Sequence, residues 1–208
     1  MIMFKGLHYS NAAVYNTLTF LKLGLDFYTR FIIASKYVKP GDSVLDLCSG
    51  NGSLERFLPA GCRYECVEMS PEFSLQLERN KIVNHRQNLH NGLDMKGSRY
   101  DIAVMIISLC HFRETSAHRL LEDLKNTAGR VLILEDVLEH RRSMSNPVQI
   151  AMNYLCASDY YVPLELYTVS DFNNIMQEHG YAVTKHSERY YAGVYDSLPS
   201  AVPEHNNL

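Results

Sequence analysis

The 208-residue chain has no long hydrophobic run and no dense basic cluster. No apolar stretch approaches the roughly 20 residues that a helix needs to cross a bilayer, which argues against a membrane protein. Beyond Arg141-Arg142 no basic residues cluster and the net charge is −3, so we expect no binding to a nucleic acid backbone. The first residues lack the charged-then-apolar order of a signal peptide, and we therefore expect a cytoplasmic protein.

Cysteine is scarce in the patterns that bind zinc or form disulfides. The chain has five cysteines and no C-x-x-C pair; they are Cys48, Cys62, Cys66, Cys110 and Cys156. Cys62 and Cys66 are the closest pair, but they flank a strand-like segment and no second pair could complete a tetrahedral site. We therefore expect reduced, buried thiols, without a disulfide framework or a metal site.

The chain does contain a short apolar run followed at once by a glycine turn. Residues 43–47 (Ser-Val-Leu-Asp-Leu) precede the turn at 48–52 (Cys-Ser-Gly-Asn-Gly), and residues 53–58 resume in helical style. This order is typical of the first unit of a parallel α/β sheet, where bare backbone N–H groups can face a ligand. Gly50 and Gly52 would let the backbone approach where a Cβ atom would collide. An ordinary turn, with glycines for geometry alone, is the alternative.

Hydrophobic periodicity predicts the remaining elements. Residues 10–38 are expected to be helical, as one helix or two, with an apolar stripe of Val14, Leu18, Leu21, Leu25 and Ile32. Further strands are predicted at residues 63–68, 87–91, 100–107 and 130–135. Further helices are predicted at 70–81, 115–127, around 149–158, and from a Ser170 cap to Gly180. Two β-rich runs, 183–187 and 190–195, are too close for a crossover helix and must form a hairpin.

This order of elements predicts the fold class. Five strand–helix alternations and a hairpin indicate an α/β protein with a seven-stranded, mostly parallel, Rossmann-like sheet. We expect helices on both faces and a C-terminal antiparallel hairpin. No repeat or linker divides the chain, so we expect a single domain over residues 1–208, with an N-terminal helical cap (1–38), a catalytic core (39–196) and a tail (197–208).

Carboxylates near the predicted strand ends indicate the class of ligand. Glu68 ends the second strand, where a carboxylate can accept hydrogen bonds from both hydroxyls of a ribose. Asp94 is expected to accept from an adenine amino group, with Met95 beside the ring. Asp46, Glu68 and Asp94 would form an acidic rim suited to a sulfonium and an ammonium group. The sequence therefore points to an adenosine-bearing, positively charged ligand.

The same turn lacks the features that bind phosphate. A dinucleotide site needs G-x-G-x-x-G, but Glu55 stands at the third glycine position, where a carboxylate would repel a pyrophosphate. The Gly-Lys-Ser of a P-loop is absent as well. A nicotinamide or nucleotide triphosphate site is therefore disfavoured.

Over roughly residues 38–196 the chain resembles the class I S-adenosylmethionine-dependent methyltransferases. Residues 44–52 resemble the first motif of that family, with Cys48 at the first glycine as in the quinone C-methyltransferase branch. Residues 68–71 resemble its ribose motif, 92–95 its adenine motif, 100–112 its fourth strand, 129–135 its fifth, and 167–172 with 180–181 its closing helix and hairpin. The motifs are weak singly and specific together, because their order and spacing agree.

The resemblance implies S-adenosylmethionine as cofactor, with S-adenosylhomocysteine as product. It implies binding by Asp46, Cys48, Ser49, Gly50, Gly52, Glu68, Met69, Asp94, Met95 and Ser108. The implied reaction is an in-line displacement, in which the protein mainly supplies positioning and desolvation. A general base matters only for a hydroxyl or a charged amine acceptor. His111 is the first candidate base and His140 the second; a structural hydrogen bond is the alternative role for His111.

The acceptor class follows from the length of the chain. The segment around residues 152–155 lies where this family builds its acceptor lid, and 208 residues leave no room for a separate target-recognition domain. We therefore expect a small-molecule acceptor and neither nucleic acid nor membrane as partner; a monomer and a homodimer are both compatible with the sequence. A methyltransferase acting on a protein or RNA partner, and a non-catalytic cofactor-binding subunit, are the alternatives.

Overall fold

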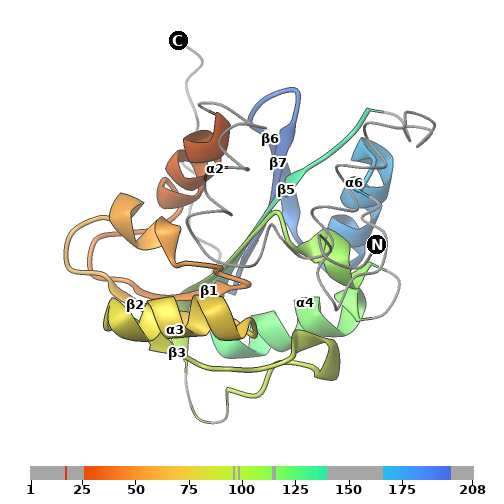
Figure 1. Ribbon diagram of the computed structural model, residues 1–208. Coiled ribbons are helices and arrows are strands. Elements are labelled where there is room, and N and C mark those ends of the chain that lie inside the picture. The colour runs from red at the N-terminus through yellow and green to blue at the C-terminus, as the bar shows by residue number, and fades with distance from the viewer. Residues whose placement is uncertain are drawn as a thin grey trace, which may run out of the picture.

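The computed structural model describes residues 26–95, 97, 99–113, 116–139 and 166–197, together with Thr17. Seven strands in these residues form one sheet with the order β3-β2-β1-β4-β5-β7-β6 (Figure 1). The strands are β1 (Ser43–Leu47), β2 (Arg63–Val67), β3 (Val83–Asn84), β4 (Tyr100–Ile106), β5 (Ala128–Asp136), β6 (Ala182–Lys185) and β7 (Tyr190–Asp196). Every neighbouring pair is parallel except the two that contain β7. The predicted sheet and hairpin are confirmed.

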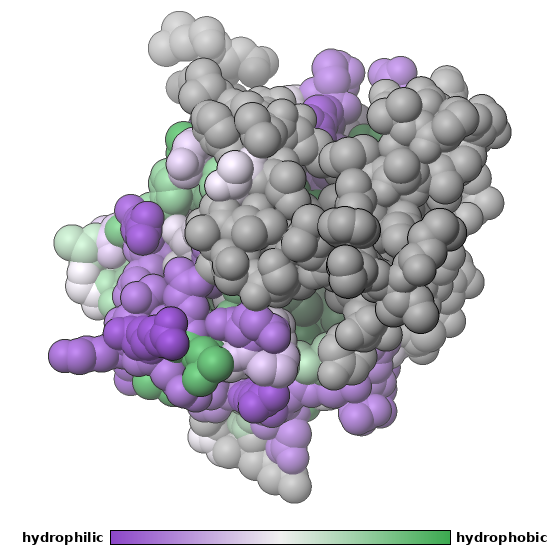
Figure 2. Space-filling model, in the orientation of Figure 1, coloured by the Kyte–Doolittle hydropathy of each residue, from purple (hydrophilic) through white to green (hydrophobic). Residues whose placement is uncertain are grey.

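Helices cover both faces of this sheet (Figure 1). The helical elements are α2 (Asp26–Ser35), η2 (Ser53–Phe57), α3 (Pro71–Arg79), η3 (Leu89–Asn91), η4 (Leu109–Phe112), α4 (Ala117–Thr127) and α6 (Val169–Glu178). One hydrophobic cluster joins α2, η2 and α3 to the sheet, and the other joins η3, η4, α4 and α6. Successive residues of β4 alternate between them, with Ala103 and Met105 in one and Ile102 and Val104 in the other. The outer surface over α3 is mainly hydrophilic (Figure 2).

The third strand is not where the sequence pattern places it. Residues 87–91 were expected to be extended, but β3 is the two-residue Val83–Asn84 at the sheet edge, and η3 begins at Leu89. The Asn88 side chain accepts a hydrogen bond from the backbone N–H of His90 at 3.0 Å. Asparagine side chains favour such local bonds over strand pairing, and an edge strand buries too little apolar surface to oppose them.

Two helices differ in detail from the prediction. Residues 53–57 form the 3₁₀ helix η2, whereas an α-like helix was expected. Helix α6 is capped by Thr168, whose hydroxyl accepts from the backbone N–H of Asp171 at 3.1 Å; the predicted cap, Ser170, lies inside the helix. Both serine and threonine are favoured N-cap residues, and serine slightly more so, which is why the sequence alone favoured Ser170.

Helix α2 buries a different stripe from the one predicted. Phe27, Phe31 and Ala34 face the core, whereas Ile32 is 48% exposed. The other predicted stripe residues, the predicted helix around 149–158 and the tail beyond residue 197 lie outside the described residues. No helix in the described part of the chain is long and apolar enough to span a bilayer.

The register between β1 and β4 is fixed at their amino ends. The Asp101 carboxylate accepts from both the backbone N–H and the hydroxyl of Ser43, at 2.8 and 2.6 Å. Because β1, β2, β4 and β5 are parallel, their carboxyl ends meet at the opposite edge of the sheet. In an open α/β sheet that edge is where ligands bind.

Candidate functional site at the carboxyl ends of the strands

The turn after β1 is built from left-handed backbone conformations. Cys48, Gly50 and Gly52 have φ angles of 54°, 57° and 73°. The Cys48 backbone N–H donates to the Val67 carbonyl at 2.8 Å, which ties the turn to the end of β2. A non-glycine residue with positive φ is uncommon and is often found at a functional site.

The two glycines of the turn serve different purposes. A Cβ atom on Gly52 would lie 2.8 Å from Leu77 Cδ2 and 3.1 Å from Ile82 Cδ1, so Gly52 allows the turn to pack against the core. Among the described residues, a Cβ atom on Gly50 would meet only Phe73 Cε2, at 4.0 Å. Gly50 therefore leaves open space at the turn, as a ligand site requires.

Glu68 lies over this turn. Its Oε2 accepts from the Gly50 N–H at 2.8 Å and its Oε1 accepts from the Ser70 N–H at 2.7 Å. Burial raises the pKa of Glu68, and the hydrogen bonds from Ser70 and Gly50 oppose that shift. The Met69 N–H bonds to the same carboxylate. Because a carboxylate offers about four lone-pair sites, the group can still accept from a ligand.

Asp46 supports the turn from within the sheet. It is 3% exposed, and the Tyr64 hydroxyl donates to its carboxyl oxygen. Burial raises the pKa of Asp46 to about 7. Its carboxyl is therefore engaged by the protein, whereas that of Glu68 faces the turn.

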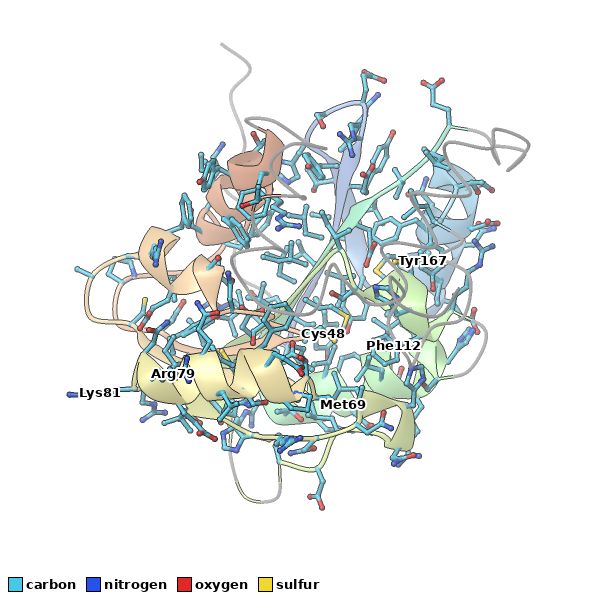
Figure 3. All side chains as sticks on the ribbon, viewed as in Figure 1. Cys48, Met69, Arg79, Lys81, Phe112 and Tyr167 are labelled. Atoms are coloured by element: carbon cyan, nitrogen blue, oxygen red, sulfur yellow. The ribbon has the colours of Figure 1, made fainter. Side chains whose placement is uncertain are left out.

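Cys48, Ser49 and Ser108 gather at the same edge. Burial raises the pKa of the Cys48 thiol well above its ordinary value, so it remains protonated, and it lies within hydrogen-bonding reach of the Ser108 side chain. The Ser49 hydroxyl is buried and has no partner among the described residues. Figure 3 shows Cys48 in the centre of this edge, with Met69 and Phe112 nearby in the view, while Arg79 and Lys81 lie at the far end of α3.

Asp94 and Met95 are not brought together with these residues. They line a cavity of about 450 Å³ whose other lining residues are Leu93, Gly97, Arg99, Asp123, Asn126 and Thr127. Arg99 directly precedes β4 and Thr127 directly precedes β5, so this cavity lies toward the amino ends of the strands. The segment after η3 is already returning to the start of β4. The Asp94 backbone is also bonded to the Gln87 side chain, at 2.8 and 2.9 Å. The adenine role of Asp94 and Met95 stays a prediction.

His111 lies in η4, directly after β4. Burial, and to a smaller extent the nearby His90, lower the pKa of His111. The His90 ring comes from η3 and lies 4.7 Å from the Phe112 ring, so η3 and η4 meet at this edge. A lowered pKa keeps the imidazole neutral near pH 7, the form that can accept a proton. His140, the second candidate, lies outside the described residues.

Glu135, near the end of β5, was missed by sequence reasoning. It is fully buried; its Oε1 accepts from the N–H groups of Ser108 and Leu109 at 2.8 and 2.5 Å, and its Oε2 has no partner in the described part of the chain. Burial raises the pKa of Glu135 to about 8. The available signal was a carboxylate closing an otherwise apolar strand, Val131 to Leu134.

Tyr167 lies near Glu135 and was missed as well. Burial, followed by the charge of Glu135, raises the pKa of Tyr167, and its hydroxyl is buried without a partner among the described residues. The Arg113 guanidinium lies 4.9 Å from the Tyr167 ring and pairs with Asp171 at 2.6 Å, which holds Tyr167 between η4 and α6 (Figure 3). Buried polar atoms normally have a hydrogen-bond partner, so a ligand or a water molecule is expected to bond to these atoms.

The charges at this edge fit a cation. The carboxylates of Glu68, Asp46 and Glu135 all lie close enough to raise the pKa of the Cys48 thiol. Near pH 7 the carboxyl of Glu135 is mostly protonated and that of Asp46 is partly protonated, and the negative charge that remains would repel a phosphate and attract a sulfonium or ammonium group. The donor set, Glu68 with the open turn at Gly50, therefore fits the adenosyl sulfonium ligand expected from the sequence.

Comparison with known proteins gives one family. A family model described as a methyltransferase domain matches residues 23–186. Among curated proteins none matches the chain.

Solved structures share the fold at low sequence identity. The chain is similar to DhpI in complex with SAH (TM-score 0.65, 16% identity, covering 89% of this chain and 91% of that one). It is similar to the mitomycin 7-O-methyltransferase MmcR (0.60, 14%, covering 91% and 59%). A third is the magnesium protoporphyrin IX methyltransferase ChlM from Synechocystis PCC 6803 with bound SAH (0.54, 16%, covering 88% and 85%).

Proposed function

The chain belongs to the methyltransferase-domain family, and from this premise we propose that it binds S-adenosylmethionine and transfers the methyl group to a small-molecule acceptor. The observation that carries the proposal is the Glu68 carboxylate, fixed over the open turn by the N–H groups of Gly50 and Ser70. The neighbours crystallised with SAH, and the O-methyltransferase among them, support the cofactor and the acceptor class.

The binding residues follow from the geometry of the turn. Glu68 would accept from the ribose hydroxyls, and the space beside Gly50 would admit the ligand close to the backbone. Met69 follows Glu68 and would offer its thioether to the face of the adenine. The negative charge around Cys48 would favour the cationic cofactor over its neutral product, since the product has lost the sulfonium charge.

Bound S-adenosylmethionine would supply a methyl group already activated by the sulfonium. The residues of this chain would orient the acceptor and exclude water, effects worth up to roughly 7–11 kcal/mol in well-aligned reactions. For a hydroxyl acceptor, neutral His111 would take the proton. Glu135 would hold the backbone of η4, and thus His111, in place through Ser108 and Leu109.

Calorimetric titration with S-adenosylmethionine, S-adenosylhomocysteine and NADH tests the cofactor. We expect binding of the first two and none of NADH. Binding of NADH with neither adenosyl sulfur compound bound would overturn the proposal. Incubation with methyl-labelled cofactor and small-molecule metabolite extracts, in parallel with protein and RNA fractions, tests the acceptor; we expect label in the small-molecule fraction.

A further inference from the structure

Two histidines and two glutamates meet between α4 and the end of α6, outside the methyl-transfer site. His118 lies in the first turn of α4, while Glu178 is the last residue of α6 and His179 follows it. One ligand atom from each of these three residues lies within 4.8 Å of the others. Glu122 lies one helical turn after His118 and contacts His179. In Figure 1, α6 lies on the right and α4 crosses the lower middle of the view.

The contact with Glu122 indicates which ring nitrogen of His179 carries the proton and which presents a lone pair. His179 Nδ1 lies 2.6 Å from Glu122 Oε1. The same oxygen lies 2.6 Å from the Lys125 ammonium, and a carboxylate paired with an ammonium group only accepts hydrogen bonds. Nδ1 of His179 therefore carries the proton, and in the neutral ring Nε2 presents a lone pair. A carboxylate behind a metal-binding histidine is the usual arrangement in zinc sites.

The lone pair of His179 faces the second imidazole. His179 Nε2 lies 2.9 Å from His118 Nδ1, and Glu178 Oε1 lies 3.7 Å from the same His118 atom. Ligands about 2.0–2.1 Å from a tetrahedral zinc ion lie roughly 3.3 Å from one another. The two observed separations bracket that value, and all three ligand atoms lie within 4.8 Å of one another. Small side-chain rotations would bring them to the distances that zinc requires.

We propose that His118, Glu178 and His179 form a site for a divalent transition-metal ion of the zinc type, with Glu122 and Lys125 orienting His179. Two imidazoles and one carboxylate suit the borderline softness of zinc, and a fourth position stays open to solvent. His118 and Glu178 have side chains 60% and 63% exposed, so an ion can reach the site directly. The bound ion would fasten the end of α6 to the start of α4.

Zinc binding to the full chain tests this site. After dialysis against EDTA, calorimetric titration with zinc chloride should show one ion bound per chain, and Co²⁺ should give a visible d–d band. At free zinc about 100 times the dissociation constant, the thermal midpoint should rise by roughly 5–10 °C. Absence of zinc binding by the unmodified chain would overturn the proposal.

Variants locate the ion. His118→Ala leaves the fold intact because this side chain is exposed on a helix, and it should weaken zinc binding at least about tenfold. Glu122→Gln should weaken it roughly 10–100-fold, since it removes the acceptor that orients His179. His85→Gln is the control, because His85 pairs with a single carboxylate, Glu65, at 2.7 Å. Unchanged affinity in His118→Ala would show that the ion binds elsewhere and would overturn the assignment.

Discussion

The Glu68 carboxylate combines two tasks that are usually separate. It closes the turn by accepting from Gly50 and Ser70, and it retains capacity to accept a further hydrogen bond. A single residue thus shapes the turn and, under the proposed function, binds the ribose hydroxyls. This dual use explains why an alanine variant would confound folding of the turn with ligand recognition.

Glu68→Gln separates the two tasks. The amide oxygen can still accept one backbone N–H, while the charge is lost. We expect S-adenosylmethionine affinity to fall roughly 10- to 100-fold, the value of one or more charge-assisted hydrogen bonds. Calorimetry measures the change. Glu122→Gln is the matched control, because Glu122 lies in α4 outside the methyl-transfer site, and it should change affinity less than about twofold. Equal losses in the two variants would contradict the placement of the site.

His111→Ala tests the proposed base. With a hydroxyl acceptor we expect kcat to fall roughly 100- to 10,000-fold while cofactor affinity stays nearly constant. In the unmodified enzyme the rate should fall on the acid side with a midpoint below about 6.5, because only the neutral imidazole accepts a proton and burial lowers its pKa. The pH–rate profile checks this. An unaltered acid limb in the variant would assign His111 to packing.

At the scale of elements, the turn after β1 depends on two glycines for different reasons. Gly52 is needed for packing against α3, and Gly50 is needed for access. The sequence predicted the same role for both, because both are glycines in one tight turn. The two roles differ because Leu77 and Ile82 lie close to Gly52 in the folded protein.

Substitution by alanine should separate them by experiment. Gly52→Ala should lower the free energy of unfolding by roughly 1–3 kcal/mol, because φ is +73° and the new Cβ would press on Leu77. Gly50→Ala should lower the free energy of unfolding by about 1 kcal/mol, through backbone strain. Its loss of cofactor-binding free energy should be larger than this loss of stability. Urea unfolding and calorimetry on both variants measure these effects. A larger stability loss in Gly50→Ala would reverse the assignment.

At the scale of the whole molecule, two buried carboxyls make stability depend on pH. Burial raises the pKa of Asp46 to about 7 and that of Glu135 to about 8. In the unfolded chain these groups titrate near 3.9 and 4.3. Between about pH 4 and pH 7–8 the unfolded state has released protons that the folded state retains, so these groups make stability fall as pH rises.

The substitution Glu135→Gln replaces one of these titrating carboxyls with an amide that does not bind or release protons. The amide resembles the protonated acid and keeps an acceptor for Ser108 or Leu109. Relative to the unmodified chain, we expect the variant to gain roughly 1–3 kcal/mol of stability between pH 5 and pH 8. Urea unfolding at both pH values measures the difference. A constant difference between the two proteins would show that Glu135 is ionised throughout this range.

Local patterns in the sequence were enough to determine the sheet, the glycine turn and the position of Glu68 beside it. Apolar runs, glycine positions and cap residues act over a few neighbours, and the parallel order follows from strand–helix alternation. The turn at Gly50 and the carboxylate at Glu68 were therefore predictable, and so was the C-terminal hairpin.

Tertiary structure alone decided where the intervening segments run. Asp94, for example, lines a cavity together with Arg99 and Thr127, which precede β4 and β5. Glu135 meets the start of η4, and His118 meets His179, only because β5 and α6 pack beside β4 and α4. Such contacts join residues far apart in sequence, and their positions depend on the packing of whole elements, which no local pattern encodes.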